Sequence, residues 1–120
     1  MTKDDLQAYS DAWNAHDIDR IMTYHTEDCV FDTGGGTEKY GTRFSGYDQV
    51  RKRFIEVWTD LPDVRFEQGS HFVSGNRGCS EWTFLATRPD GTVIEVEGCD
   101  LFTFQDGKIR IKNSLLKDRK

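Results

Sequence analysis

The sequence has few cysteines, no long apolar run and no excess of positive charge. Its three cysteines, Cys29, Cys79 and Cys99, are odd in number and form no C-x-x-C pair, which argues against a disulfide framework or a zinc site. The three histidines also lack ligand spacing, so we expect no metal. No stretch approaches the roughly 18 apolar residues that a membrane span requires.

Positive charge is scarce as well: 16 Lys and Arg stand against 21 Asp and Glu, a net charge of −5. Because a basic face is the usual footprint of nucleic-acid binding, we expect no nucleic-acid partner. The run from Met1 to Asp5 turns polar at once, with no apolar segment typical of a secretory signal. We therefore expect a soluble, cytoplasmic protein that does not bind membranes and keeps its thiols reduced.

The 120 residues suffice for one domain, residues 1–120. Apolar residues make up only 36%, but eight Phe, four Tyr and three Trp supply large buried areas. Helical periodicity fills the first half of the chain and strand periodicity the second, which predicts an α+β fold. The glycine run Gly34–Gly36 precedes no helix, as a phosphate-binding loop would, so we expect no nucleotide and no other cofactor.

Two helices are expected at the start of the chain. Thr2 is placed to cap the first, which runs to about Ala15 with an apolar stripe at helical spacing. Asp17 is placed to cap a short second helix, which we expect to carry Ile18, Ile21, Met22 and His25.

A brief strand at 29–32 and a polar, glycine-rich loop at 33–41 are expected next. Such a loop is too flexible for a core and suits the rim of a pocket. A third helix follows Ser45-Gly46 and ends at Leu61-Pro62. It presents one apolar face, made of Val50, Phe54, Val57, Trp58 and Leu61.

The second half predicts four strands, at about 64–73, 78–88, 92–104 and 108–116. Pro89-Asp90-Gly91 and Gln105-Asp106-Gly107 both have the composition of three-residue hairpin loops. With both loops of that length, Trp82 faces Gly98, and Asp100 lies between Ser80 and Lys112. A two-residue Asp-Gly loop would instead pair Asp100 with Asn113 and turn Lys112 away.

Under the three-residue register the strands present two different faces. Side chains alternate along a strand, so one face carries Trp82, Phe84, Val96, Asp100, Phe102 and Lys112. The opposite face carries Cys99, Leu101, Ile109 and Ile111 among charged residues. This apolar stripe needs cover, and we expect a homodimer formed through that outer sheet face.

Two stretches resemble a known family. Trp13 to Ile18 resembles the break between the first two helices of NTF2-like proteins, and Gly98 to Ile109 resembles the G-x-D-x-F-x-F-x-D-G-K-I hairpin of their SnoaL-like branch. The resemblance covers essentially the whole chain. It implies a cystatin-like cone in which three N-terminal helices pack on a curved antiparallel sheet and enclose a pocket. That fold serves several enzymes and non-catalytic modules.

The same resemblance suggests catalytic positions. In ketosteroid isomerase, which belongs to this superfamily, the oxyanion-hole tyrosine matches Tyr9 and the protonated aspartic acid matches Asp100. The base of that enzyme aligns with Thr33, so a one-residue shift would give Asp32 its role. The second polar partner of SnoaL-type cyclases falls near Ala86, which leaves that catalytic pair incomplete.

The residues themselves also single out Asp100. It lies in an apolar strand between Val96 and Phe102, where an uncompensated carboxylate is costly. Such a group has either a catalytic role or a cationic partner, for which Lys112 is the candidate. We expect the substrate to contact Lys112 and an aromatic wall suited to a flat apolar molecule, made of Trp13, Phe54, Trp58, Trp82, Phe84 and Phe102.

These observations favour a cofactor-independent enzyme that moves a proton next to a carbonyl group of a small hydrophobic compound, as an isomerase, dehydratase or cyclase does. In this hypothesis Asp100 transfers the proton, Tyr9 stabilises the oxyanion and Asp32 assists as a base. The alternative is a non-catalytic ligand-binding or dimerisation module, in which Asp100 and Lys112 form a structural ion pair.

Overall fold

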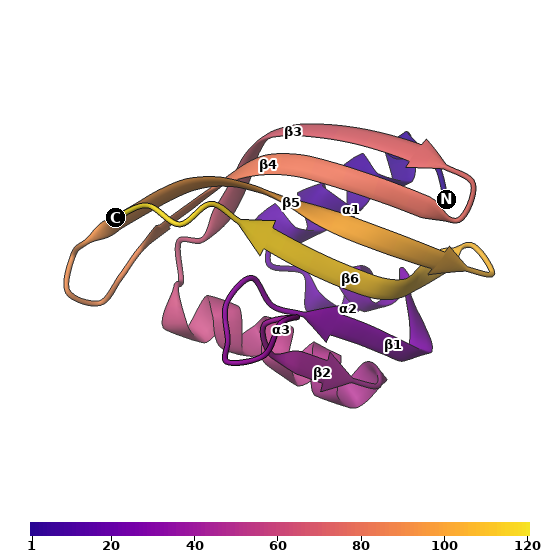
Figure 1. Cartoon of the computed structure of the whole chain (residues 1–120), viewed down its shortest axis with the longest axis horizontal. Helices are drawn as coiled ribbons and strands as arrows, with labels where there is room; N and C mark the ends of the chain where they lie inside the picture. Colours follow the sequence, from indigo (N-terminus) through magenta and orange to yellow (C-terminus); the bar gives the residue numbers. More distant parts are fainter.

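The computed structural model describes residues 1–120 and shows a curved six-stranded sheet with three helices packed against it (Figure 1). The elements, in chain order, are α1 (Lys3–Asn14), α2 (Ile18–Met22), β1 (His25–Asp32), β2 (Arg43–Ser45), α3 (Tyr47–Asp60), β3 (Arg65–Ser74), β4 (Arg77–Thr87), β5 (Val93–Gln105) and β6 (Lys108–Leu116).

The strands are arranged in the order β2-β1-β6-β5-β4-β3. Neighbouring strands are antiparallel except β1 and β6, which run parallel, so the expectation of a wholly antiparallel sheet was wrong at this pair. Helix α1 packs on β3, and α3 packs on β1. All three helices come from the first half of the chain, but two strands, β1 and β2, precede α3.

The helix starts predicted from capping residues are confirmed. Thr2 forms a reciprocal capping box with Asp5, and the Asp17 side chain accepts a hydrogen bond from the Arg20 backbone. The second helix does not extend to His25, because it ends at Met22. The Tyr24 carbonyl then accepts a hydrogen bond from Ile109 on β6, which directs the following residues into a strand.

Strand β1 is therefore longer than predicted. Its first half carries polar residues, so no apolar run marks it in the sequence. Strand β2 was not predicted, because three residues are too few to show a period. It is held by backbone pairing with β1, in the register Phe31↔Phe44.

The first long hairpin has the predicted register: the Arg88 amide donates to the Thr92 carbonyl, and Trp82 faces Gly98. The second hairpin differs. Its loop contains two residues, Asp106 and Gly107, both with positive φ, as the tight hairpin turns favoured by Asp-Gly require.

A bulge then returns the later residues of β6 to the faces that the predicted register gave them. Phe104 pairs with Ile109 but Thr103 pairs with Ile111, so Arg110 is an extra residue in β6. Asp100 consequently pairs with Ser114 rather than with Lys112 or Asn113.

The bulge has two consequences for the predicted faces. Lys112, opposite Phe102, lies on the same face as Asp100, as expected. Ile109, which we assigned to the outer face, is instead fully buried in the core, because the extra residue lies between it and Lys112.

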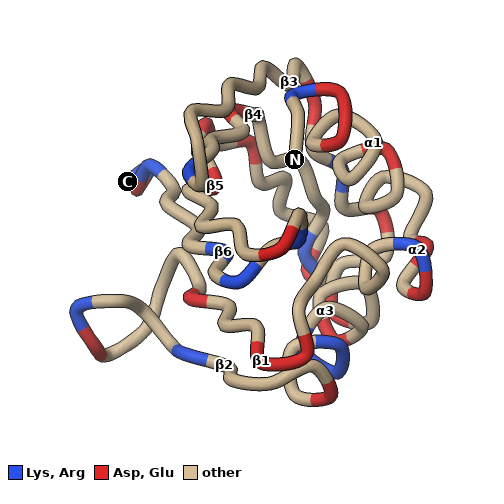
Figure 2. Tube along the Cα trace, turned by 90° about the vertical axis from the view of Figure 1, so that its right-hand side faces the viewer, with Lys and Arg blue, Asp and Glu red and all other residues tan.

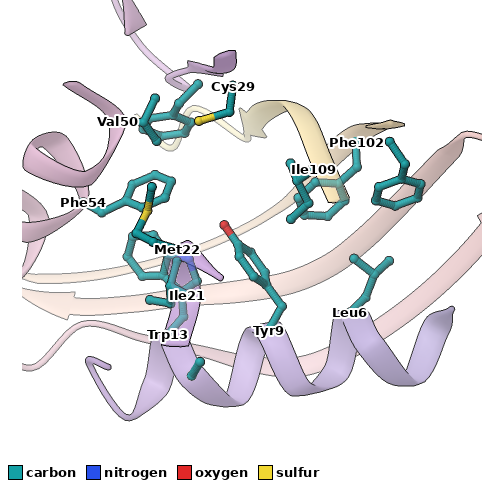
Figure 3. Close-up of a cluster of buried hydrophobic side chains, with 13 residues drawn as sticks. Leu6, Tyr9, Trp13, Ile21, Met22, Cys29, Val50, Phe54, Phe102 and Ile109 are labelled. Atoms are coloured by element: carbon teal, nitrogen blue, oxygen red, sulfur yellow. The ribbon is translucent and has the colours of Figure 1, made fainter. Parts of the chain in front are cut away.

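The core lies between α1, α2, α3 and the inner face of the sheet (Figure 3). Leu6, Tyr9 and Trp13 project from successive turns of α1 towards it, as their helical spacing predicted. Phe54 of α3 and Phe102 of β5 are fully buried there. Aromatic rings therefore supply much of the buried surface, in agreement with the composition.

Charged residues are distributed over helices, strands and turns, with the two signs interspersed (Figure 2). No helix is long and apolar enough to cross a membrane.

Candidate functional site

A cavity of about 370 Å³ opens between α3, the inner face of the sheet and the loop that follows β1. Its wall is largely aromatic, with Trp13, Phe31, Phe44, Phe66, Trp82 and Phe84 contributing. Three charged residues, Arg53, Asp60 and Lys112, also line it, together with three hydroxyl-bearing residues, Thr33, Thr42 and Ser114. Its size and lining are those of a small-molecule site: mostly apolar, with few polar groups.

Asp100 lies behind this wall and accepts three hydrogen bonds. Trp82 Nε1 donates to Oδ2 over 3.1 Å, and Lys112 Nζ donates to the same oxygen over 2.9 Å. Ser114 Oγ donates to Oδ1 over 2.5 Å. The side chains of Asp100 and Lys112 are only 6% and 5% exposed, so the structure shows a buried ion pair.

Lys112 connects this pair to the cavity. Of its three ammonium protons, one donates to a protein acceptor, Asp100. Aromatic rings surround the ammonium, whose nitrogen lies 5.3 to 5.9 Å from the ring centres of Tyr9, Trp13, Phe31, Phe54 and Phe102. The rings and the Asp100 carboxylate therefore both attract the ammonium.

Asp100 itself does not line the large cavity. It borders a much smaller space, about 10 Å³, together with Tyr9 and Ser80. Lys112 and Ser114 both contact Asp100 and both line the large cavity. Trp82 does the same, so three side chains connect Asp100 to the cavity.

Tyr9 is directed into the core rather than into the large cavity (Figure 3). Its hydroxyl and His25 Nε2 share a hydrogen bond of 2.8 Å. Burial raises the pKa of Tyr9 well above its usual value, and burial beside the Lys112 charge lowers the pKa of His25 to about 3. Both groups are neutral at pH 7, and the predicted position of Tyr9 at the cavity is not observed.

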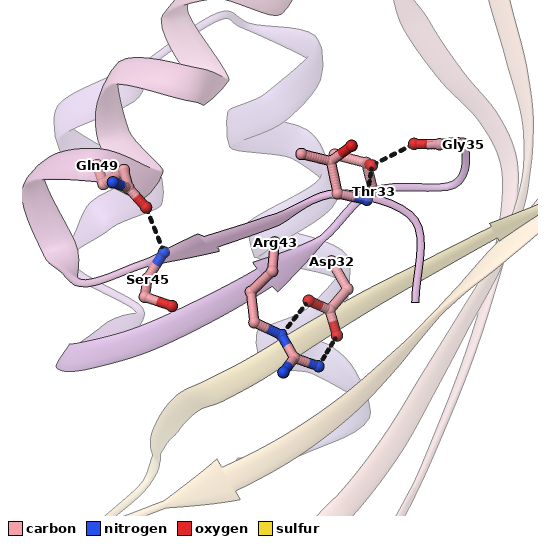
Figure 4. Close-up of polar contacts among 7 residues, drawn as sticks. Asp32, Thr33, Gly35, Arg43, Ser45 and Gln49 are labelled. Carbon is pink, nitrogen blue, oxygen red and sulfur yellow. Dashed lines mark hydrogen bonds and ion pairs between the residues drawn. The ribbon is translucent and has the colours of Figure 1, made fainter. Parts of the chain in front are cut away.

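Asp32 lies on the opposite face of β1. Its neighbour Phe31 lines the cavity, while the Asp32 carboxylate binds Arg43 of β2 through two hydrogen bonds of 2.8 and 3.0 Å (Figure 4). The structure thus does not bring Asp32 to Asp100, because strand alternation turns it away. The one-residue shift that would have placed it in the cavity does not occur, and Thr33 lines the cavity instead.

The predicted aromatic wall is present in part. Trp13, Trp82 and Phe84 line the cavity, as does Lys112. Phe54 and Phe102 are fully buried in the core behind it.

Trp58 does not line the cavity either. Its ring stacks on His16 at 4.9 Å and meets Trp13 edge-on at 5.2 Å, so it supports the wall from behind.

The sequence analysis missed Arg53, Phe44 and Ser114. Arg53 had a signal, since it lies three residues after Val50 and four before Val57 on the apolar side of α3. Phe44 belongs to the strand that was not predicted, and Ser114 reaches Asp100 only because of the bulge in β6.

No group of three His, Cys, Asp or Glu side chains is arranged to hold a metal ion. The arrangement offers hydrogen-bond donation from Lys112 and an acceptor oxygen on Ser114, whose own proton is donated to Asp100.

Trp82→Phe is expected to lower the free energy of unfolding by about 1.5–3 kcal/mol beyond the effect of the smaller ring, since Asp100 loses one of its donors. Trp58→Phe is the matched control, because Trp58 Nε1 has no hydrogen-bond partner to lose. Urea denaturation of both variants measures the difference. Equal losses in the two variants would show that the Trp82–Asp100 hydrogen bond contributes nothing.

Comparison with known proteins identifies the family. The SnoaL-like domain profile matches residues 6–111. The chain belongs to the SnoaL-like domain family. No curated protein matches this SnoaL-like chain significantly.

Several solved structures share the SnoaL-like fold of this protein. An NTF2-like protein of unknown function from Mesorhizobium loti is 25% identical, with a TM-score of 0.78, and the match covers 94% of this chain and 88% of that one. TerC, crystallised with polyporic acid, is 21% identical, with a TM-score of 0.80 and coverage of 93% and 88%.

A hypothetical protein with a ketosteroid isomerase-like fold from Catenulispora acidiphila, in complex with trimethylamine, is 14% identical. Its TM-score is 0.81 and the match covers 95% of this chain and 85% of that one. Together these structures establish the NTF2-like, α+β cone for this SnoaL-like protein.

Proposed function

We propose that the protein binds a small, flat, mostly apolar carbonyl compound in the aromatic cavity and moves a proton next to its carbonyl group. One observation carries the proposal: Lys112 is a buried ammonium that lines the cavity and donates only one hydrogen bond to a protein acceptor, although it has three protons. An oxygen atom of a ligand is the partner that such a group favours.

Lys112 supplies the electrostatic part of the reaction. Its ammonium donates a hydrogen bond to the substrate oxygen and stabilises the negative charge that develops there when the neighbouring carbon loses a proton. Because the ammonium is held by Asp100 and surrounded by rings, it is oriented in advance and little water competes with it. Lys112 thus takes the oxyanion role that the resemblance suggested for Tyr9.

Ser114 and Asp100 supply the proton acceptor. The Ser114 oxygen takes the proton from the substrate carbon while its own proton passes to Asp100 Oδ1, 2.5 Å away. The electron pair of the broken C–H bond remains on the substrate as the enolate. Reversal of the two transfers at another atom of the substrate completes an isomerisation, or starts the loss of a leaving group.

Deuterium exchange tests this proposal without knowledge of the natural substrate. The protein in heavy water is expected to exchange the methyl protons of acetylnaphthalene, and the double variant Asp100→Asn/Lys112→Met is expected to lose about 10²-fold or more of that rate. The double change removes both charges together, so that neither is left buried alone. NMR of the acetyl methyl group measures the rate.

A matched control is Asp32→Asn/Arg43→Met, which removes an ion pair that does not face the cavity. This control should keep the exchange rate of the parent protein. Equal exchange by the parent protein and the Asp100/Lys112 double variant would refute the catalytic role of the pair.

A second candidate is a binding module without catalysis. It is favoured by the three donors that already surround Asp100, which make this carboxylate well satisfied as a purely structural group. Binding of acetylnaphthalene, seen as a rise in melting temperature, with no exchange of its protons would support this candidate.

The two small-molecule complexes among the related structures support a ligand-binding use of the fold. TerC was crystallised with polyporic acid and the Catenulispora protein with trimethylamine. For the present chain the ligand class is inferred from its own cavity wall.

We also propose that the outer sheet face forms a homodimer. Phe72 of β3 and Leu115 of β6 lie on that face with 57% and 48% of their surface exposed, next to Leu101 and Ile111. Sedimentation at several concentrations tests the proposal, and Phe72→Glu should shift the protein to the monomer.

A further inference from the structure

We infer that the ligand of this cavity carries an anionic group, and that Arg53 binds it. The inference rests on the proposed function and narrows its substrate class to flat carbonyl compounds that also bear a carboxylate. Arg53 and Lys112 are the two cationic side chains on the cavity wall, and they come from different elements, α3 and β6.

The two cations are arranged along one aromatic surface. The Arg53 guanidinium carbon lies 5.7 Å from the centre of the Phe44 ring. Phe44 stacks on Phe31 with 6.4 Å between ring centres and 24° between planes, and Lys112 Nζ lies 5.9 Å from the centre of Phe31. Each of the two adjacent rings therefore has one cation beside it, so a flat molecule on the rings can meet both.

The two cations differ in how strongly an acidic partner neutralises them. Lys112 is paired with buried Asp100 at 2.9 Å. The acidic partner of Arg53 is Glu56, at 3.5 Å and 47% exposed, where water screens the interaction. The Arg53 guanidinium thus keeps most of its capacity to bind an anion.

A polar atom of Arg53 also lacks a partner. Its Nε is buried and donates no hydrogen bond within the protein, whereas buried donors are ordinarily paired. The planar edge of a guanidinium matches the two oxygens of a carboxylate. Asp60, the acidic residue on the wall, is exposed at the last position of α3 and does not neutralise Arg53 through any ion pair.

The roles of the two cations are then distinct. Lys112 polarises the carbonyl oxygen at the reacting end of the ligand, and Arg53 holds the carboxylate at the other end. Arg53 is in this sense a specificity residue: it selects an acid over the corresponding neutral compound.

Calorimetry with a matched pair of probes tests the inference. The probes are an acetylnaphthoate, with its ketone and carboxylate on different rings, and the methyl ester of the same compound. The acid is expected to bind about tenfold more tightly than the ester, since a charged hydrogen bond to Arg53 is lost in the ester. Arg53→Gln should remove this preference by weakening the acid alone.

Two further variants serve as controls. Arg53→Lys keeps the charge and should keep part of the preference. Arg51→Gln changes an arginine of the same helix that does not line the cavity, and it should keep all of the preference. Melting curves confirm that each variant is folded.

The outcomes separate the two proposals. Equal binding of acid and ester by the parent protein, or an equal loss of both in Arg53→Gln, would overturn the inference while leaving the ligand-binding cavity in place. Failure of both probes to bind would overturn the inference together with the proposed function.

Discussion

Asp100→Asn is expected to lower the free energy of unfolding by about 3–5 kcal/mol, among the largest losses available from a single substitution in this chain. The change leaves the Lys112 ammonium buried at 5% exposure without a carboxylate. It also replaces an acceptor of three hydrogen bonds by an amide, whose nitrogen cannot accept. Urea denaturation followed by tryptophan fluorescence measures the loss.

The double variant Asp100→Asn/Lys112→Met is the control for this result. It should recover a large part of the stability, because no charge then remains buried alone. A double-mutant cycle over the two single variants and the double variant gives the coupling energy between the side chains. If Asp100→Asn were as stable as the parent protein, or more so, the carboxylate would be a strained functional group rather than a structural anchor.

The second large effect is a loss of stability in mild acid caused by His25. Burial lowers the pKa of His25 to about 3 in the folded protein, whereas an unfolded histidine has a pKa of about 6.5. Below pH 6.5 the unfolded chain therefore binds a proton that the folded chain does not. The free energy of unfolding should fall by roughly 1.4 kcal/mol per pH unit from pH 6.5 towards pH 3 on this account alone.

His25→Gln removes this contribution while keeping a polar partner for Tyr9. The difference between the parent protein and this variant, measured by urea denaturation from pH 7 to pH 4.5, isolates the effect of His25 from that of the carboxylates. His71→Gln is the comparison: burial also lowers the pKa of His71, but this ring is only partly buried. Parallel pH profiles for the parent protein and His25→Gln would contradict a neutral, buried His25.

The sequence predicted most of the fold because its local signals agreed with each other. Thr2 and Asp17 mark helix starts by capping, and Arg88 to Thr92 marks a hairpin by its turn residues. Strand β2 has no comparable signal, since three residues show no period and its backbone is ordered only by pairing with β1.

The candidate site was predicted less completely, for reasons of geometry. Asp100 and Lys112 share one face as predicted, but the bulge at Arg110 brings this about, since the predicted three-residue loop does not occur. That Asp100 lies behind the cavity wall depends on three donors from β4 and β6, which no single segment reveals. Arg53 reaches the cavity because of how α3 sits on the sheet, a tertiary property that helical periodicity alone does not fix.

The bulge at Arg110 makes the polar groups of the cavity tolerant of a one-residue change in the length of this hairpin. With the two-residue turn at Asp106-Gly107, the strand accommodates Arg110 outside the ladder, and the residues after it keep the partners of a regular hairpin one residue shorter. Loss of the Arg110 codon would therefore leave Lys112 opposite Phe102 and Ser114 opposite Asp100, in a regular ladder without the bulge. A hairpin of this kind can therefore gain or lose one residue at the bulge during evolution while the cavity keeps its ammonium and its hydroxyl group.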